Sequence, residues 1–153
     1  WQMRIRRRRM EYSAKENGLG FSLLTGIQKI KLAGAEKRAF AKWGFVDWIQ
    51  FANYEIGDII YIYASKQEGT IRYKTIVTKN NMTFAEIEKD ESLWINTHDL
   101  RREKMKYSRL KLMKRIDNPR LNFVMLKQHG LKNAPQRVKR LDGELLEYIE
   151  SLE

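Results

Sequence analysis

The stretch that decides the fold runs from residue 56 to residue 78 and reads IGDIIYIYASKQEGTIRYKTIVT. Its first half contains the continuous apolar and aromatic run Ile59 to Tyr63, which is typical of a β-strand. Its second half, Gly69 to Thr78, alternates apolar side chains with cations, which indicates another strand. Residues 66–69 between them read KQEG, and glycine can supply the positive φ that a tight turn requires. The sequence therefore predicts an antiparallel hairpin.

The residues that follow this hairpin predict one more strand and two helices. Tyr107 to Ile116 alternates so that one face can join the core while the other face is basic. Asn122 to His129 is expected to form a short helix that begins at an asparagine N-cap and ends at Gly130. Asp142 is expected to cap a last helix, Gly143 to Leu152, whose apolar residues recur at helical spacing.

The N-terminal third is the most basic part of the chain. Residues 1–43 hold 11 lysine and arginine residues against 3 acidic ones, so they carry +8 of the formal net charge of +11. The apolar residues that recur there at helical spacing are Leu23, Leu24, Ile27 and Ile30. We therefore expect two or three helical pieces between residues 10 and 42. The predicted organisation is a helical basic arm, residues 1–36, followed by one domain, residues 37–153.

The formal net charge of +11 on 18.3 kDa bounds the kind of partner that the chain attracts. A positive field of this strength attracts polyanions over about a Debye length, roughly 8–10 Å at physiological salt. Nucleic acid is the commonest such partner and an anionic membrane surface is second, while the plainest alternative is that the charge serves solubility alone. No apolar run approaches the roughly 20 residues that span a bilayer, so we expect no membrane span and a cytoplasmic location.

The residue types that carry catalysis and metal binding are sparse. The chain has no cysteine, which excludes disulfides, thiolate zinc sites and a thiol nucleophile. Its histidines, His98 and His129, are too far apart in sequence for a helical metal pair. The acidic patch from Glu86 to Glu91 has no recognisable order of metal ligands. We therefore expect a protein that is not an enzyme and that uses no metal or other cofactor.

Three segments taken in order resemble a known family. Residues 47–50 read DWIQ, residues 56–65 read IGDIIYIYAS and residues 71–74 read IRYK, a series that resembles the PUA-like modules of the EVE type, relatives of ASCH domains. The resemblance continues through residues 126–149 and covers residues 37–153. It implies an α+β fold, a mixed or antiparallel PUA-like β-barrel flanked by short helices. It also implies a cleft that holds a flipped, often modified, base.

The chain departs from the pattern of that family in two places. Ala64 stands where many EVE proteins carry a histidine before the serine. No equivalent of their first strand is evident upstream of Lys37, because the texture of the sequence changes to strands only after Trp43. The residues before Lys37 are therefore expected to lie outside the barrel.

Reading a base requires a flat apolar clamp, hydrogen-bonding groups for the base edge and cations for the flanking phosphates. Trp48 and Tyr63 are the preferred clamp, because the family motif carries them, and Tyr61 and Trp94 are further candidates. The candidates for the base edge are Ser65, Asn53, Gln50 and Gln136. The candidates for phosphate contacts, taken from alternating strand positions, are Arg72, Lys74, Arg109, Lys111 and Arg115. The alternatives stay open that the rings fill the core and that the cations are simply solvated.

A second resemblance covers residues 10–43. Residues 21–40, which read FSLLTGIQKIKLAGAEKRAF, resemble the cytosolic helical extension of the membrane domain in ABC transporters that export peptides and bacteriocins. The chain has neither the apolar spans of such a transporter nor a Walker A loop, so transport and ATP hydrolysis are not expected. The resemblance implies instead a fused segment that docks on another protein.

These observations lead to one preferred function and two alternatives. The preferred function is a nucleic-acid-binding module that reads a modified, flipped base, with DNA favoured over RNA, and that serves a bacterial restriction and modification system beside a partner nuclease. The first alternative is a protein-interaction module that docks through the amphipathic helices of residues 1–36, with the barrel as its scaffold. The second is a barrel that serves only as a structural scaffold. The oligomeric state stays open.

Overall fold

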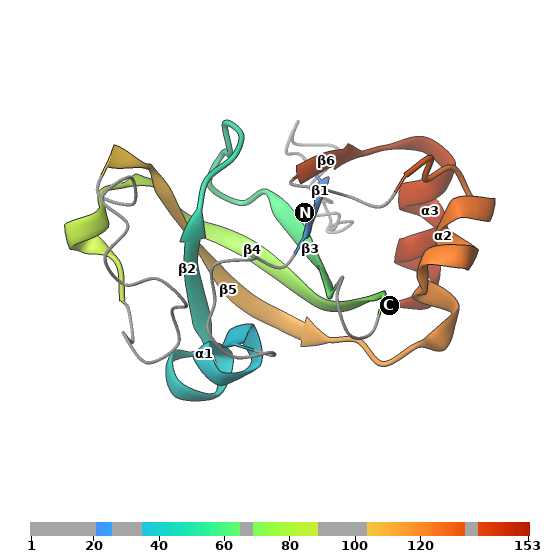
Figure 1. Cartoon of the computed structure of the whole chain (residues 1–153), viewed down its shortest axis with the longest axis horizontal. Coiled ribbons are helices and arrows are strands. Elements are labelled where there is room, and N and C mark those ends of the chain that lie inside the picture. The colour runs from blue at the N-terminus through green and yellow to red at the C-terminus, as the bar shows by residue number, and fades with distance from the viewer. Residues whose placement is uncertain (1–20, 26–34, 65–68, 89–103, 134–137) are drawn as a thin grey trace.

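The computed structural model describes residues 21–25, 35–64, 69–88, 104–133 and 138–153 (Figure 1). The strands within these residues are β1 (Phe21–Thr25), β2 (Phe45–Ile49), β3 (Ile59–Ala64), β4 (Thr70–Met82), β5 (Tyr107–Arg115) and β6 (Val138–Leu141). The helices there are α1 (Ala35–Trp43), α2 (Phe123–Gln128) and α3 (Gly143–Leu152), with the short 3-10 helices η1 (Phe84–Glu86) and η4 (Pro119–Leu121). None of the helices in these ranges is long and apolar enough to cross a membrane.

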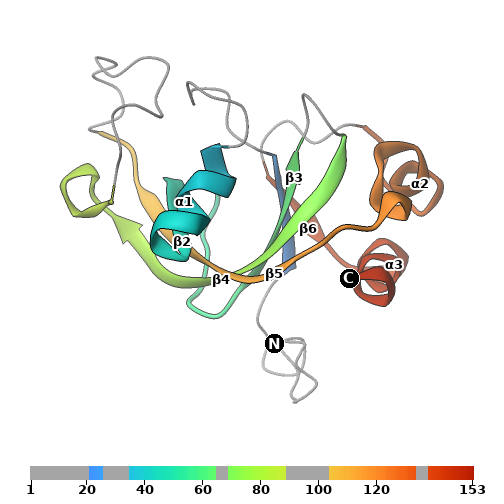
Figure 2. The same ribbon diagram turned by 90° about the horizontal axis from the view of Figure 1, so that it is seen from below.

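The strands form one mixed sheet in the order β2-β5-β4-β3-β1-β6. Neighbouring strands are antiparallel except β1 and β3, which run parallel. The register of the long strand β4 shifts at several points along its pairing with β5, and such bulges bend a strand and increase its twist. The sheet consequently curls, as Figure 2 shows. This mixed sheet with short helices confirms the predicted α+β class and the predicted β3–β4 pair.

The position of β1 corrects the expectation of a wholly helical arm. Residues 21–25 lie between β3 and β6 in the sheet, so Leu23 and Leu24 belong to a strand rather than to a helix. The sheet therefore includes a strand upstream of Lys37, and it draws on residues from both sides of the predicted boundary at residue 36. Helix α1 confirms one of the helical pieces expected between residues 10 and 42. The other expected pieces fall on residues 10–20 and 26–34, which lie outside the described ranges.

Strand β3 is apolar on both sides and separates two hydrophobic clusters, because successive side chains of a strand point to opposite faces. The cluster on one face, named here the α3 cluster, consists of Ile59, Tyr61, Tyr63, Ile71, Ile116, Leu121, Leu126, Leu131, Leu141, Leu145, Leu146 and Ile149. The cluster on the other face, named here the α1 cluster, consists of Ala39, Phe40, Val46, Trp48, Ile49, Tyr54, Ile60, Ile62, Tyr73, Val77, Met82, Ile87, Tyr107 and Leu110. Each face of the sheet thus has its own core.

The C-terminal helices begin at the N-cap residues that the sequence predicts. The Asn122 side chain accepts a hydrogen bond from the backbone N–H of Met125 at 2.8 Å, which caps α2, and Gly130 follows the helix with a φ of +118°. Asp142 occupies the N-cap position of α3, but its side chain forms no capping hydrogen bond. The His129 and Tyr148 rings stack with centroids 3.7 Å apart, which fixes the end of α2 against α3.

Replacing Ser22 with proline tests whether β1 is a working strand of the sheet. Ser22 lies between register partners on β3 and on β6, so proline removes one ladder hydrogen bond and leaves its partner carbonyl unsatisfied. We expect Ser22→Pro to lower the free energy of unfolding by about 1–3 kcal/mol in urea titrations. The matched variant Ser22→Thr keeps the backbone donor and favours a strand, so its stability should stay close to that of the unmodified protein. Equal stability of the two variants would contradict the strand.

Candidate nucleic-acid interface

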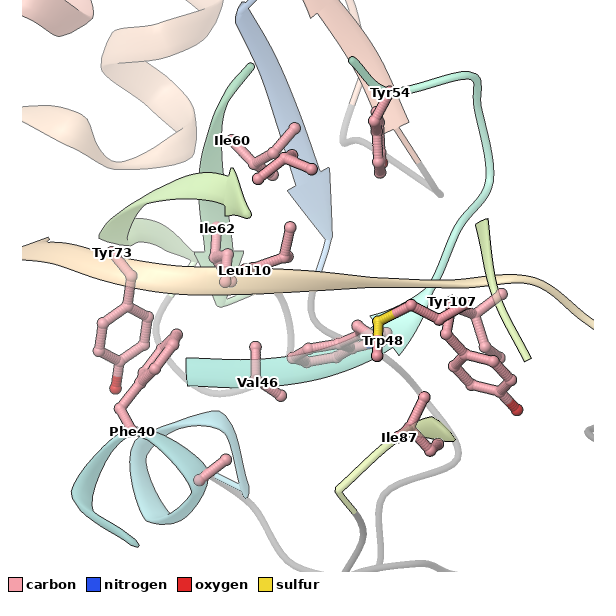
Figure 3. Packing of buried hydrophobic residues seen from close by; sticks show 14 residues of the cluster. Phe40, Val46, Trp48, Tyr54, Ile60, Ile62, Tyr73, Ile87, Tyr107 and Leu110 are labelled. Carbon is pink, nitrogen blue, oxygen red and sulfur yellow. The ribbon is translucent and has the colours of Figure 1, made fainter. Parts of the chain in front are cut away.

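The two preferred clamp rings lie on opposite faces of the sheet. Trp48 belongs to the α1 cluster and is 1% exposed, while Tyr63 belongs to the α3 cluster and is 3% exposed. Figure 3 shows the Trp48 ring in the interior of the α1 cluster, near Val46, Tyr107 and Ile87. The structure therefore does not bring Trp48 and Tyr63 together, and they cannot close on the same base. This geometry corrects the expectation of a paired clamp, because the alternation of side chains decides the face on which each ring lies.

Tyr61 and Lys74 belong to an internal polar cluster. The Tyr61 hydroxyl donates a hydrogen bond to one carboxylate oxygen of Glu153, and the Lys74 ammonium forms an ion pair with the other. Lys74 Nζ also lies 5.9 Å from the centroid of the Tyr61 ring. Both side chains are buried, so Lys74 compensates a carboxylate inside the fold rather than facing a phosphate.

The other four predicted phosphate ligands differ in their surroundings. Arg72 forms a 3.0 Å ion pair with Asp117, and Arg109 forms a two-pronged pair with Asp47, at 2.8 and 2.9 Å. These hydrogen bonds to Asp47 are the main reason that the pKa of Arg109 is raised, and burial acts against them. Lys111 and Arg115 are exposed on β5. The predicted single track of five cations is therefore divided, and Lys111 and Arg115 are its solvent-facing members.

Of the remaining predicted base contacts, the structure describes Asn53. Asn53 is exposed in the segment between β2 and β3. Ser65, Trp94 and Gln136 lie outside the described residues. Their assignment as base contacts stays a prediction from the sequence.

The structure shows an aromatic and cationic surface at the end of α1 that the sequence did not predict. The Trp43 and Phe45 rings stack with centroids 6.1 Å apart and an interplanar angle of 22°, and both are half-buried. Lys42 Nζ lies 4.9 Å from the centroid of the Trp43 ring, and the guanidinium carbon of Arg109 lies 4.0 Å from that of Phe45. The signal available in the sequence is residues 42–45, KWGF, but nothing local shows that Arg109 joins them.

A hollow of about 440 Å³ lies beside the bulged end of β4. Its lining consists of Ile56, Thr78, Lys79, Asn80, Asn81, Met82 and Glu86. Asn81 adopts a left-handed φ of +52°, and its backbone N–H and its side chain exchange 3.0 Å hydrogen bonds with the Gln50 amide. Carboxamides can read base edges, and the sequence predicts that role for Gln50. In the structure, the Gln50 side chain is hydrogen-bonded to Asn81 instead.

Three buried polar atoms have no hydrogen-bond partner among the described residues: Trp48 Nε1, Tyr54 Oη and Ser108 Oγ. Trp48 and Ser108 are register partners on β2 and β5, so two of these atoms belong to neighbouring positions of one face. Burial, reinforced by the Asp58 carboxylate, raises the pKa of Tyr54, and burial also raises the pKa of Tyr63. Within the described ranges no group of three or more histidine, aspartate or glutamate side chains is arranged to hold a metal ion.

Comparison with known proteins shows which fold this is. No protein-family model matches the sequence, and no curated protein is similar enough in sequence to match. The structure is similar to an ASCH protein from Zymomonas mobilis, with a TM-score of 0.60 and 13% identity over 87% of this chain and 95% of that chain. It is also similar to the human THYN1 protein in complex with 5-methylcytosine-containing DNA, with a TM-score of 0.59 and 12% identity over 87% of this chain and 96% of that chain.

A hypothetical protein from Leishmania major is a further structural relative, with a TM-score of 0.58 and 17% identity over 87% of this chain and 93% of that chain. Another neighbour is the DUF55 domain of human thymocyte nuclear protein 1. ASCH and DUF55 domains are of the PUA-like and EVE-like type, so these likenesses confirm the predicted fold. At these identities the likeness establishes the fold alone.

Replacing Tyr54 and Tyr61 with phenylalanine compares two buried hydroxyls, of which only that of Tyr61 has a hydrogen-bond partner among the described residues. Tyr54→Phe removes a buried hydroxyl that pairs with none of the described residues, so the free energy of unfolding should rise by about 1 kcal/mol at pH 7. Tyr61→Phe removes the bond to Glu153 and should lower it by about 1.5–3 kcal/mol. Urea titrations measure both values, and a destabilised Tyr54→Phe variant would contradict the assignment.

The alkaline stability of the same variants tests the raised pKa of Tyr54. The unfolded chain loses this proton from about pH 10, while the folded chain retains it, so stability is present below pH 10 and is lost as the pH rises above it. Tyr54→Phe should therefore lose less stability than the unmodified protein between pH 9 and pH 11. The slopes of unfolding free energy against pH should differ by up to the equivalent of one bound proton. Equal slopes would show that Tyr54 ionises at the same pH in both states.

Proposed function

We propose that this chain is a nucleic-acid-binding module that reads a base, with DNA as the preferred partner. The observation that carries the proposal is the likeness, over most of both chains, to the human THYN1 protein, whose structure holds DNA containing 5-methylcytosine. A modified cytosine in DNA is accordingly the first base to test. In this proposal the module binds and does not catalyse, and it directs a partner nuclease to modified DNA.

The charge of the chain supports a nucleic-acid partner. The formal net charge is +11, and exposed cations lie along the two longest strands of the sheet, at Lys79 on β4 and at Lys111, Lys114 and Arg115 on β5. Exposed cations of this kind neutralise phosphates and release condensed counterions, which makes binding fall steeply with salt. The binding of this chain to DNA should therefore be strongly salt-dependent.

The base itself is proposed to bind where β1 and β3 end. The two strands run parallel, with Thr25 and Tyr63 as register partners, so their carboxyl ends lie side by side. In open α/β sheets, ligands bind outside the carboxyl ends of parallel strands, and the proposal places the base by analogy at this end. Ser65 follows β3 directly in the sequence, which makes its hydroxyl the first candidate for a hydrogen bond to the base edge. Trp94 and Gln136 are the further candidates, and Trp48 and Tyr61 are assigned to the core.

Binding of matched oligonucleotides tests the proposed function. Fluorescence anisotropy should show tighter binding to duplexes with one 5-methylcytosine than to the same duplexes with cytosine. The logarithm of the association constant should fall linearly with the logarithm of salt, with a slope of about −0.9 for each phosphate contacted. No binding to DNA or RNA at low salt would reject the proposal, and equal affinity for both duplexes would reject the reading of this base.

The variant Ser65→Ala tests the location of the base contact. A lost hydrogen bond to the base edge should reduce the preference for the modified base by about five- to tenfold, since one such bond contributes about 1 kcal/mol. Ser151→Ala is the matched control, because Ser151 is exposed on α3 and its hydroxyl donates to the Tyr148 carbonyl. Trp48→Ala is unsuitable, because truncating a buried tryptophan costs about 3–5 kcal/mol of stability. An unchanged preference in Ser65→Ala would move the site elsewhere.

A further inference from the structure

The face of β2 that points away from the α1 cluster carries an unusual set of side chains. Val46 and Trp48 point into the α1 cluster, so Phe45, which alternates with them, points to the opposite face. Phe45 packs against neither hydrophobic cluster and is only half-buried. Figure 2 shows α2 and α3 at the end of the sheet far from β2. This aromatic ring therefore has a position that core packing does not explain.

An arginine covers one face of the Phe45 ring, and a tryptophan ring stacks with it. The Trp43 ring, which also packs against the α1 cluster, stacks with Phe45 at a centroid distance of 6.1 Å, and the guanidinium carbon of Arg109 lies over the Phe45 ring, 4.0 Å from its centroid. Asp47 grips Arg109 through two hydrogen bonds and also accepts one from the Glu88 backbone N–H, at 2.7 Å. Because Asp47 neutralises and orients the guanidinium, Arg109 contributes a fixed plane rather than a free charge.

Free charge is supplied by the lysines on either side of that plane. Lys111 is the register partner of Phe45, and Lys79 is the register partner of Arg109, so all of these positions share one face across β2, β5 and β4. Lys79 and Lys111 are both exposed. Adjacent strands lie about 4.8 Å apart, so the two lysines border the aromatic surface within roughly 10 Å.

The hollow beside β4 continues this surface. Lys79 lines the hollow together with Asn80 and Asn81, and the Thr78 hydroxyl, which also lines it, reaches the Arg109 carbonyl at 3.5 Å. Among the described residues, three carboxylates lie in this region: Asp47 holds Arg109, Glu86 accepts a hydrogen bond from the Thr83 backbone N–H at 2.7 Å, and the exposed Glu88 contributes to the raised pKa of Arg109. The surface across β2, β5 and β4 therefore contains planar groups for stacking, side-chain amides and lysines.

We infer that this outer face, defined by Trp43, Phe45, Arg109, Lys111 and Lys79, binds a single-stranded stretch of nucleic acid beside the base that the module reads. Unstacked bases lie on the Phe45 and Trp43 rings, and the phosphates lie along Lys111 and Lys79. Aromatic rings interleaved with cations are the arrangement by which proteins hold single strands without reading their sequence. The inference rests on the proposed function, and it adds a second contact that is indifferent to base modification.

Two oligonucleotides of equal charge distinguish base stacking on the rings from electrostatic attraction of the phosphates. The probes are an oligothymidine of about 12 nucleotides, within the site sizes of single-strand binders, and an abasic strand of the same length. The unmodified protein should bind the oligothymidine about tenfold more tightly than the abasic strand, because the abasic strand offers phosphates without bases. Equal affinity for the two strands would overturn the inference.

Substitutions on the outer face locate the contact. Phe45→Leu keeps an apolar side chain but removes the ring, so it should abolish the tenfold preference for oligothymidine while leaving the midpoint of urea unfolding close to its original value. Lys111→Gln should reduce the salt slope of single-strand binding by about 0.7, the value for one phosphate. Lys132→Gln, at an exposed position after α2, is the matched control and should change neither quantity.

The outcomes distinguish this inference from the proposed function. If Phe45→Leu loses the oligothymidine preference but retains the preference for 5-methylcytosine duplexes, both ideas are supported. If Phe45→Leu binds oligothymidine as the unmodified protein does, while that protein still prefers 5-methylcytosine duplexes, only the outer face is rejected. If the unmodified protein binds no nucleic acid at all, the proposed function itself fails.

Discussion

The constraint on which the rest of the structure depends is that β3 is buried on both faces. Its odd-numbered side chains from Ile59 to Tyr63 enter the α3 cluster, and its even-numbered ones enter the α1 cluster. A strand of this kind must lie inside the sheet with a layer over each face, which is why α1 packs on one face while α2 and α3 pack on the other. The large rings of the central strands are consequently part of the two cores.

This constraint decides which residues are left for binding. Rings on central strands are unavailable, so flat surfaces for a base come from the edge strand β2 and from the end of α1, where Phe45 and Trp43 are half-buried. A comparable division holds for the cations. Lys74 and Arg109 neutralise Glu153 and Asp47 at partly or fully buried positions, whereas Lys79 and Lys111 face solvent. Buried ion pairs cost desolvation when they form and are costly to break, so the charges of Lys74 and Arg109 serve the fold, even though the Arg109 plane belongs to the inferred binding surface.

The relation between fold and function follows the same lines. PUA-like domains with little sequence identity share this architecture, so the sheet alone does not decide what each domain binds. In this chain the proposed base contact lies where the parallel strands β1 and β3 end, and the inferred strand-binding surface crosses β2, β5 and β4. A read base and its flanking strand would then contact different parts of one curled sheet.

The sequence by itself determined the elements whose signals are local: the alternation of β5, the Asn122 cap, the last helix and the β3–β4 pair. It did not determine β1, because a short apolar run such as FSLLT fits a strand or a helix until its pairing partners β3 and β6 are present. Only the tertiary structure decided which face received Trp48 and Tyr63, and which carboxylates engaged Lys74 and Arg109. The physical reason is that burial and ion pairing depend on residues distant in sequence, such as Glu153 beside Lys74, and no local pattern encodes them.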